Sequence, residues 1–170
     1  MKDDDGTRAL FHALDRLPGP RHLEHPDGFD HARARLRAAG LRAAGLRDRL
    51  SHDFGRPCRL DEGFQDASFS FSLDIPAEAT GAGVPLGVRL SDYGDLAVVI
   101  TSAPGGHDDL DDAVRDGALS ETDRDRITVA LADLGYRLVA PRLLHRPYDG
   151  VTWLTDEDHA TWWTRFFDHL

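Results

Sequence analysis

The chain has 170 residues, a formal net charge of −10 and 41% apolar residues, so its length favours one domain and its composition excludes a natively disordered polymer. No apolar run approaches the ~20 residues needed to cross a bilayer, and from the acidic start we expect no secretory signal. Cys58 is the only cysteine, which excludes an intrachain disulfide, and we expect a cytoplasmic protein with no membrane partner.

Residues 1–28 are predicted to form an N-terminal helix and a linker. From Thr7 to Leu17 apolar side chains recur at helical spacing, and a Pro-Gly-Pro sequence follows and stops the helix. The stretch from Pro18 to Gly28 holds three prolines and two glycines, which is typical of an irregular connection. A single α+β domain is expected to follow over residues 29–170.

A long helix is predicted from Phe29 to about Leu50. Two copies of Leu-Arg-Ala-Ala-Gly, at 36–40 and 41–45, cannot hold one helix face because they repeat every five residues. A longer apolar seam, with steps of four and three residues, does follow one face. Its members are Ala32, Leu36, Ala39, Ala43, Leu46 and Leu50.

Three successive segments are predicted to pair as an antiparallel meander. Apolar and polar residues alternate from Ala67 to Ile75, which is typical of a strand with one face in the core and a serine-lined face in water. The alternation returns from Val84 to Leu90. Leu96 to Thr101 is apolar on both faces, which indicates an inner strand. Whether Pro57–Leu60 forms a further short strand stays open.

The second half of the chain is predicted to form a helix, two strands and a final helix. Ser120-Glu121-Thr122-Asp123 has the capping pattern of a helix N-terminus, and Gly135 stands where a helix would end. Tyr136–Leu144 and Val151–Leu154 are predicted to be strands joined by a turn. Thr155 opens the final helix. Its apolar face comprises Trp162, Trp163, Phe166, Phe167 and Leu170.

These elements give the order α-βββ-α-ββ-α behind an N-terminal helical extension. We therefore predict an α+β fold with an antiparallel sheet of about five strands backed by helices. The order resembles the secretion-chaperone-like α+β fold over roughly residues 29–170. In size, acidity and α+β composition the chain also resembles the immunity proteins of bacterial toxin systems. These resemblances imply a binding protein that masks or escorts a basic protein partner such as a toxin.

Negative charge is concentrated in the second part of the chain. Residues 1–60 carry a net charge of +3, whereas residues 61–170 carry −13. This excess of acid disfavours nucleic acid as a partner and favours a basic protein. The most acidic stretch, residues 105–125, holds eight acids and two arginines. A calcium loop starting at Asp112 does not fit, because Val114 occupies its third position.

The acidic stretch has two interpretations. A run of charges is usually a solvated surface. The alternative is a docking surface for a basic partner, because acids there would speed association. The predicted partner-binding residues are Asp108, Asp109, Asp111, Asp112 and Asp116. Whether the chain forms a homodimer stays open.

No catalytic residue, metal site or cofactor is predicted. No feature near Cys58 lowers its pKa, so burial as a small apolar residue is favoured over a role as nucleophile. His22, His25 and His31 lie close together, but in a proline-bounded segment without the helical His-Glu-x-x-His pattern. Surface histidines are therefore favoured over a zinc site.

Two His-Asp pairs, His52-Asp53 and His107-Asp108, resemble those used by HD-type phosphohydrolases. Such enzymes need several ligands spaced along an all-helical bundle, whereas this chain is rich in predicted strands. The pairs are therefore weak indicators of catalysis.

Arginines and aromatic residues outside these motifs receive structural interpretations. Arg35, Arg42 and Arg49 form one stripe of the long helix, for which a solvated face is favoured over a nucleic-acid interface. Tyr148 and Trp153 are expected to pack against the final helix rather than to anchor an interface.

Two alternatives to a protein that binds a basic partner stay open. The first is a hydrolase or metal-dependent enzyme that uses scattered His and Asp residues, such as His107 with Asp108. The second is a regulatory module that binds a small ligand on the serine-lined face of the strand at 67–75.

Overall fold

A computed structural model describes residues 2–17, 26–61, 70–91, 93–101, 107–152 and 159–167, with side chains from residue 4 in the first segment and from residue 37 in the second. The helices are α1 (Lys2–Asp15), α2 (Pro26–Phe54), the 3-10 helix η2 (Ala77–Ala79), α3 (Leu110–Arg115), α4 (Glu121–Asp133), α5 (Pro141–Leu144) and α6 (Trp162–Phe167). The strands are β1 (Arg59–Asp61), β2 (Ser70–Ile75), β3 (Leu86–Ser91), β4 (Leu96–Ile100) and β5 (Arg137–Leu138).

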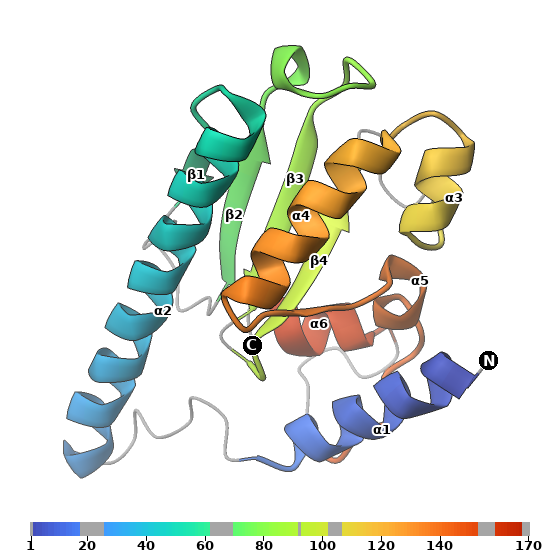
Figure 1. Cartoon of the computed structure of the whole chain (residues 1–170). Helices are drawn as coiled ribbons and strands as arrows, with labels where there is room; N and C mark the ends of the chain where they lie inside the picture. Colours follow the sequence, from blue (N-terminus) through green and yellow to red (C-terminus); the bar gives the residue numbers. More distant parts are fainter. Residues whose placement is uncertain are drawn as a thin grey trace.

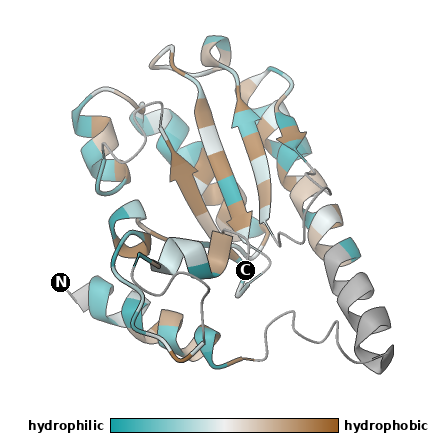
Figure 2. Cartoon of the chain, turned by 180° about the vertical axis from the view of Figure 1, so that it is seen from behind, coloured by the Kyte–Doolittle hydropathy of each residue, from teal (hydrophilic) through white to brown (hydrophobic). Residues whose placement is uncertain are grey.

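The five strands form one sheet in the order β1-β2-β3-β4-β5. The first four are antiparallel neighbours, and β5 runs parallel to β4. In Figure 1, α2 and α4 lie over one face of the sheet, whereas α1, α5 and α6 gather at its lower end. Figure 2, seen from behind, shows α6 beside the lower end of the opposite face. The α+β class and the antiparallel meander are therefore confirmed.

The first core cluster fills the space between α2, α4 and the sheet. The predicted seam of α2 is confirmed where its side chains are described, since Ala39, Ala43, Leu46 and Leu50 are buried. The apolar face of β2 lies in the same cluster. This cluster comprises Ala39, Ala43, Leu46, Leu50, Phe54, Cys58, Phe71, Leu73, Ile75, Leu86, Val88, Leu90, Ala97, Val99, Ala113, Leu119, Ile127, Ala130, Leu131 and Tyr136.

The second core cluster lies on the other face of the sheet and is rich in aromatic residues. It comprises Phe11, Leu14, Leu96, Val98, Val139, Leu143, Leu144, Trp162, Phe166 and Phe167. Phe11 of α1 packs against Trp162 and Phe166 of α6, with ring centroids 5.4 and 5.3 Å apart. Because β4 contributes to both clusters, its prediction as an inner strand is confirmed.

A buried ion pair ties α1 to α6. The side chains of Asp15 and Arg165 are 1% and 2% exposed, and Arg165 Nε donates to Asp15 Oδ1 at 2.6 Å. The Tyr148 hydroxyl and the Val151 N–H also donate to Asp15, while Arg165 Nη2 donates to the Tyr93 hydroxyl at 2.7 Å. Burial alone would raise the pKa of Asp15, but the bonds from Arg165, Val151 and Tyr148 hold it below its ordinary value.

The prediction for residues 136–144 is largely wrong. Only Arg137–Leu138 forms a strand, and it pairs parallel to β4, so the sheet is mixed rather than wholly antiparallel. Pro141 begins α5, which suits proline because the first turn of a helix needs no N–H there. In the second predicted strand, Val151 and Thr152 form a bend, and the remaining two residues lie outside the described segments.

Several boundaries also differ from the predicted ones. Helix α2 begins at Pro26 rather than Phe29, again with proline in the first turn. The acidic stretch before Ser120, for which no helix was predicted, contains α3. The final helix begins at Trp162, so its prediction is wrong over residues 159–161, where Thr161 forms an isolated bridge to Pro147. Residues 153–158, where the helix was expected to start, are not described. No helix in the described part of the chain is both long and apolar enough to cross a membrane.

Candidate ligand pocket

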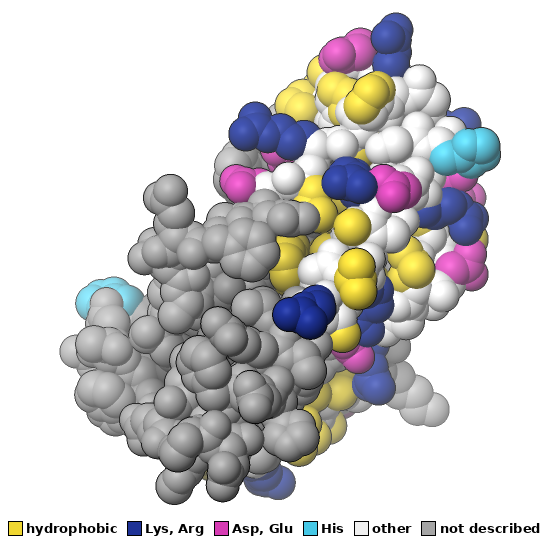
Figure 3. Space-filling view, turned by 90° about the vertical axis from the view of Figure 1, so that its left-hand side faces the viewer, with side chains coloured by type: hydrophobic (Ala, Val, Ile, Leu, Met, Phe, Trp, Pro, Cys, Tyr) yellow, Lys and Arg dark blue, Asp and Glu magenta, His cyan; other side chains and the backbone are white. Residues whose placement is uncertain are grey.

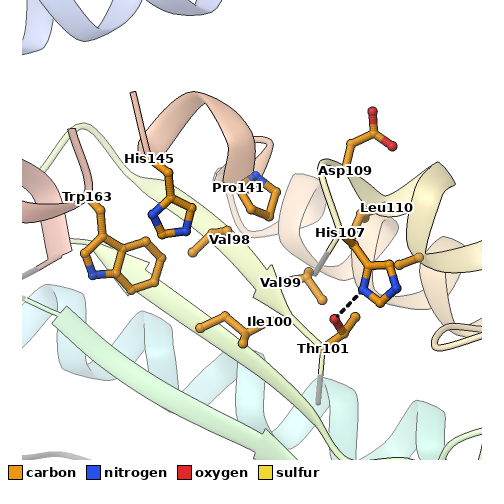
Figure 4. Close-up of a pocket in the computed structure, with 11 residues that line it drawn as sticks. Val98, Val99, Ile100, Thr101, His107, Asp109, Leu110, Pro141, His145 and Trp163 are labelled. Atoms are coloured by element: carbon orange, nitrogen blue, oxygen red, sulfur yellow. Dashed lines mark hydrogen bonds between the residues drawn. The ribbon is translucent and has the colours of Figure 1, made fainter. Parts of the chain in front are cut away.

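A pocket of about 370 Å³ lies between β4, α3, α5 and α6 (Figure 4). Its volume is within the range of small-ligand sites. Its lining is mostly apolar and comes from four elements that are far apart in the sequence. The lining residues are Val98, Val99, Ile100, Thr101, His107, Asp109, Leu110, Ala113, Pro141, His145 and Trp163.

One wall of the pocket is aromatic. The rings of His145 and Trp163 stack with centroids 5.6 Å apart and planes 12° from parallel. Trp163 also stacks on Phe167 at 5.0 Å, and the Arg89 guanidinium lies 5.9 Å from its ring. In Figure 4 the His145–Trp163 pair stands to one side of Val98 and Ile100. The pair offers a flat apolar surface against which a ligand can pack.

The opposite wall is polar. Thr101 Oγ1 lies 2.8 Å from His107 Nδ1, and His107 Nε2 lies 3.5 Å from Asp116 Oδ2. A hydroxyl, an imidazole and a carboxylate therefore stand in a row at the end of β4. The order is that of a nucleophile, a base and an orienting acid. The contact to Asp116 is long, however, and Asp116 is exposed, so it holds the imidazole only loosely.

Among the described lining residues, only Asp109 carries a carboxylate, guanidinium or ammonium group. Asp109 Oδ1 accepts the Asp112 N–H at 2.9 Å and so caps the N-terminus of α3. Its other oxygen lies 3.6 Å from Arg142 Nη1, and the Arg142 N–H donates to the Asp108 carbonyl at 3.2 Å. These contacts join α3 to α5 along the outer side of the pocket.

The predicted partner-binding acids are mostly engaged within the chain. Asp112 pairs with Arg115 at 2.6 Å, and Asp111 pairs with Arg124 at 3.0 Å. Asp109 and Asp116 make the contacts described above. Asp108 is exposed, and its N–H donates to Asp112 Oδ2 at 3.2 Å. Of the five, the structure places only Asp109 in the pocket lining, and the partner-binding role of the set stays a prediction.

The predicted burial of Cys58 is confirmed. It lies in the first core cluster, and burial raises the pKa of its thiol. The neutral thiol is therefore favoured, and the thiolate that a nucleophile needs is not. Asp53 pairs with Arg49 at 2.7 Å rather than with His52.

No metal centre is present in the described part of the chain. No group of three His, Cys, Asp or Glu side chains among these residues lies close enough to hold an ion. Of the three clustered histidines, His22 and His25 fall in the undescribed segment 18–25, and only the backbone of His31 is described.

The arginine stripe of α2 is paired with acids. Arg42 bonds to Asp95 and lies 4.5 Å from the Tyr136 ring centroid, and Arg49 contacts both Asp53 and Asp133. The side chain of Arg35 is not described. On the face in Figure 3 the described cations lie among anions rather than in one basic patch.

The serine-lined face of β2 does not form a free groove over its described part. The hydroxyls of Ser70 and Ser91 donate to the carbonyls of Phe167 and Phe166, at 3.2 and 2.6 Å. Helix α6 therefore lies against this part of the sheet, and the pocket opens beside it on the β4 side. The expected packing of Tyr148 on the final helix is confirmed by its edge contact with Trp162, whereas Trp153 is not described.

Sequence reasoning had singled out neither His145 nor Pro141 for function. Trp163 had been assigned to the core, although it is half-buried at the pocket. These residues come together only through tertiary packing. The one local indication in the sequence was Pro141, because a proline interrupts the strand predicted over residues 136–144.

Comparison with protein-family models, with curated proteins and with solved structures finds no match for this chain.

Proposed function

We propose that this protein is a non-catalytic binding protein and that the pocket between β4, α3, α5 and α6 is its ligand site. The observation that carries the proposal is the pocket itself, with about 370 Å³ of space, an apolar floor and a stacked His145–Trp163 wall. Apolar pockets with a few polar groups are the usual form of ligand sites. The site fits a ligand with an apolar group and at least one hydrogen-bonding group.

The test uses the neutral fluorescent probe N-phenyl-1-naphthylamine, which brightens in apolar surroundings. Ile100→Trp adds bulk at the pocket floor and is expected to weaken probe binding about tenfold or more, because the added ring takes the probe's space. Leu41→Trp is the matched control, since Leu41 lies on α2 and is 70% exposed. It is expected to leave probe affinity unchanged.

Circular dichroism melting of both variants checks that they fold. Absence of probe binding by the parent chain, or equal affinity in the parent and Ile100→Trp, would contradict the proposal. Equal loss in both variants would also contradict it, because the effect would then not belong to the pocket.

A second candidate function, hydrolysis, rests on the row Thr101–His107–Asp116. Thr101 is 8% exposed, and its hydroxyl already contacts the imidazole at 2.8 Å. A His-assisted hydroxyl can attack an acyl group. The test is turnover of p-nitrophenyl acetate by the parent and by His107→Gln. Turnover lost in the variant would favour hydrolysis, and equal background rates in both would favour binding alone.

A further inference from the structure

The pocket exposes the edge of β4 as well as its faces. Val98, Val99, Ile100 and Thr101, four consecutive residues, all line it. Side chains of a strand alternate between the two faces of a sheet, so a cavity over one face meets every second residue. A cavity that meets four in a row reaches around the edge, where the peptide groups lie.

Hydrogen bonds to β5 show which peptide groups of β4 point toward that edge. The Asp95 carbonyl accepts the Arg137 N–H at 2.8 Å, and the Ala97 carbonyl accepts the Val139 N–H at 2.9 Å. Peptide groups alternate in direction along a strand. The next groups to point outward are therefore those of Val99 and Thr101, whereas Val98 and Ile100 point toward β3.

The ladder stops at the position where proline removes the next donor. Residues 137 and 139 donate in turn, so residue 141 would donate to Val99, but Pro141 has no N–H and begins α5. Among the described residues, no loop or helix backbone group bonds to Val99. Val99 is 2% exposed, and a buried peptide group without a partner costs free energy. Among the described residues, the edge of β4 at Val99 thus meets the pocket without a backbone partner.

We propose that an extended peptide segment binds in this pocket by adding to β4 at Val99 and Thr101. This inference rests on the proposed ligand site and names its ligand class. The peptide N–H would donate to the Val99 carbonyl, in place of the donor that Pro141 lacks. An apolar side chain of the peptide would lie between Pro141 and the His145–Trp163 wall. Strand addition is a common mode of peptide recognition, in which backbone bonds supply affinity and side-chain pockets supply selectivity.

The two edges of the sheet differ in the way this proposal requires. The outer strand β1 carries Arg59 and Asp61, both exposed, and charged side chains on an edge discourage the addition of another strand. The open part of β4 carries only Val98, Val99 and Ile100. Asp109 at the rim and the net charge of −10 favour a peptide with basic flanks.

The probe is the pentapeptide acetyl-Lys-Val-Leu-Val-Lys-amide, with three analogues in which one of the central peptide nitrogens is methylated. Binding to the full-length chain is measured by calorimetry and by amide NMR shifts. In an added strand, alternate N–H groups face the partner and the others face away. Methylation at alternate positions is therefore expected to weaken binding about tenfold, and methylation between them less than twofold.

The amide resonances of Val99 and Thr101 are expected to shift most, and the peptide is expected to displace N-phenyl-1-naphthylamine. The inference is overturned if that probe binds the pocket but the peptide does not displace it, or if methylation has the same effect at all three positions. Failure of the probe itself to bind would instead overturn the proposed function. The two failures are therefore distinguishable.

Discussion

The two core clusters hold the two faces of the sheet in different ways. The first packs mostly aliphatic side chains of α2 and α4 against the sheet, and such packing is not directional. The second packs aromatic rings around the buried pair Asp15–Arg165, whose hydrogen bonds fix both distance and angle. Since α5 and α6 also form the pocket wall, the second core cluster positions the pocket, and the first core cluster supports the sheet.

The largest expected effect on stability is that of Asp15→Asn. The change leaves the Arg165 charge buried without its counter-charge, which is expected to lower the free energy of unfolding by about 3–5 kcal/mol. Asp53→Asn, at a surface pair with Arg49, is the control and is expected to cost less than about 1 kcal/mol. Urea unfolding measures both. Equal losses in the two variants would show that the buried pair contributes no more to the free energy of unfolding than the surface pair does.

The same pair predicts the direction of a pH effect. The pKa of Asp15 is lowered in the folded chain, so its contribution to stability is present above the unfolded value of about 4 and is lost as pH falls through the folded pKa. Urea midpoints between pH 7 and pH 2 should therefore fall more in the parent than in Asp15→Asn. Parallel curves for the two proteins would contradict this.

A smaller effect is expected from Leu46→Ala in the first core cluster. Leu46 is fully buried, so the cavity is expected to cost about 2–4 kcal/mol. Because α2 contributes no residue to the described pocket lining, the affinity for N-phenyl-1-naphthylamine should stay within twofold of the parent. A change in affinity comparable to that of Ile100→Trp would show that the two faces are not separate in function.

The cap of α3 tests the pocket's outer wall. Asp109→Ala removes the oxygen that accepts the Asp112 N–H and is expected to cost about 1 kcal/mol. Asp109→Asn keeps a capping oxygen and is expected to cost only a few tenths of that amount. Thermal melts of the two variants make the comparison. Equal losses in the two variants would mean that the ion pair with Arg142, which both changes remove, outweighs the cap.

The smallest effect on stability is expected at the exposed acids. Asp108→Asn combined with Asp111→Asn should change the free energy of unfolding by less than about 0.5 kcal/mol. If these acids dock a basic protein, a tagged pull-down should retain less of that protein with the double variant than with the parent. Unchanged retention of every partner would remove the docking role of this surface.

Much of the fold was predictable because side-chain periodicity reports burial. The α2 seam through Ala43, Leu46 and Leu50 and the alternation of β2 each follow from which face meets the core. The start of α4 was also predictable, because capping is a local interaction: the Ser120 side-chain oxygen accepts the N–H of Asp123, three residues on.

The pocket was not predictable by these means. Residues 136–144 were predicted as one strand, and no local pattern marks the end of their pairing with β4 after two residues. That end depends on a register between β4 and β5 in which the N–H position of Pro141 faces the Val99 carbonyl, and register is a tertiary property. The meeting of His145, Trp163 and His107 likewise follows from how α5 and α6 pack.

Amide hydrogen exchange of the ligand-free chain tests the open edge of β4 most directly. The account predicts that the Val98 and Ile100 amides, which point toward β3, exchange slowly, whereas the Val99 amide between them exchanges at least about tenfold faster. It also predicts that the pentapeptide slows Val99 selectively. Equal protection of Val98, Val99 and Ile100 without any ligand would contradict the account, because the edge would then already be paired.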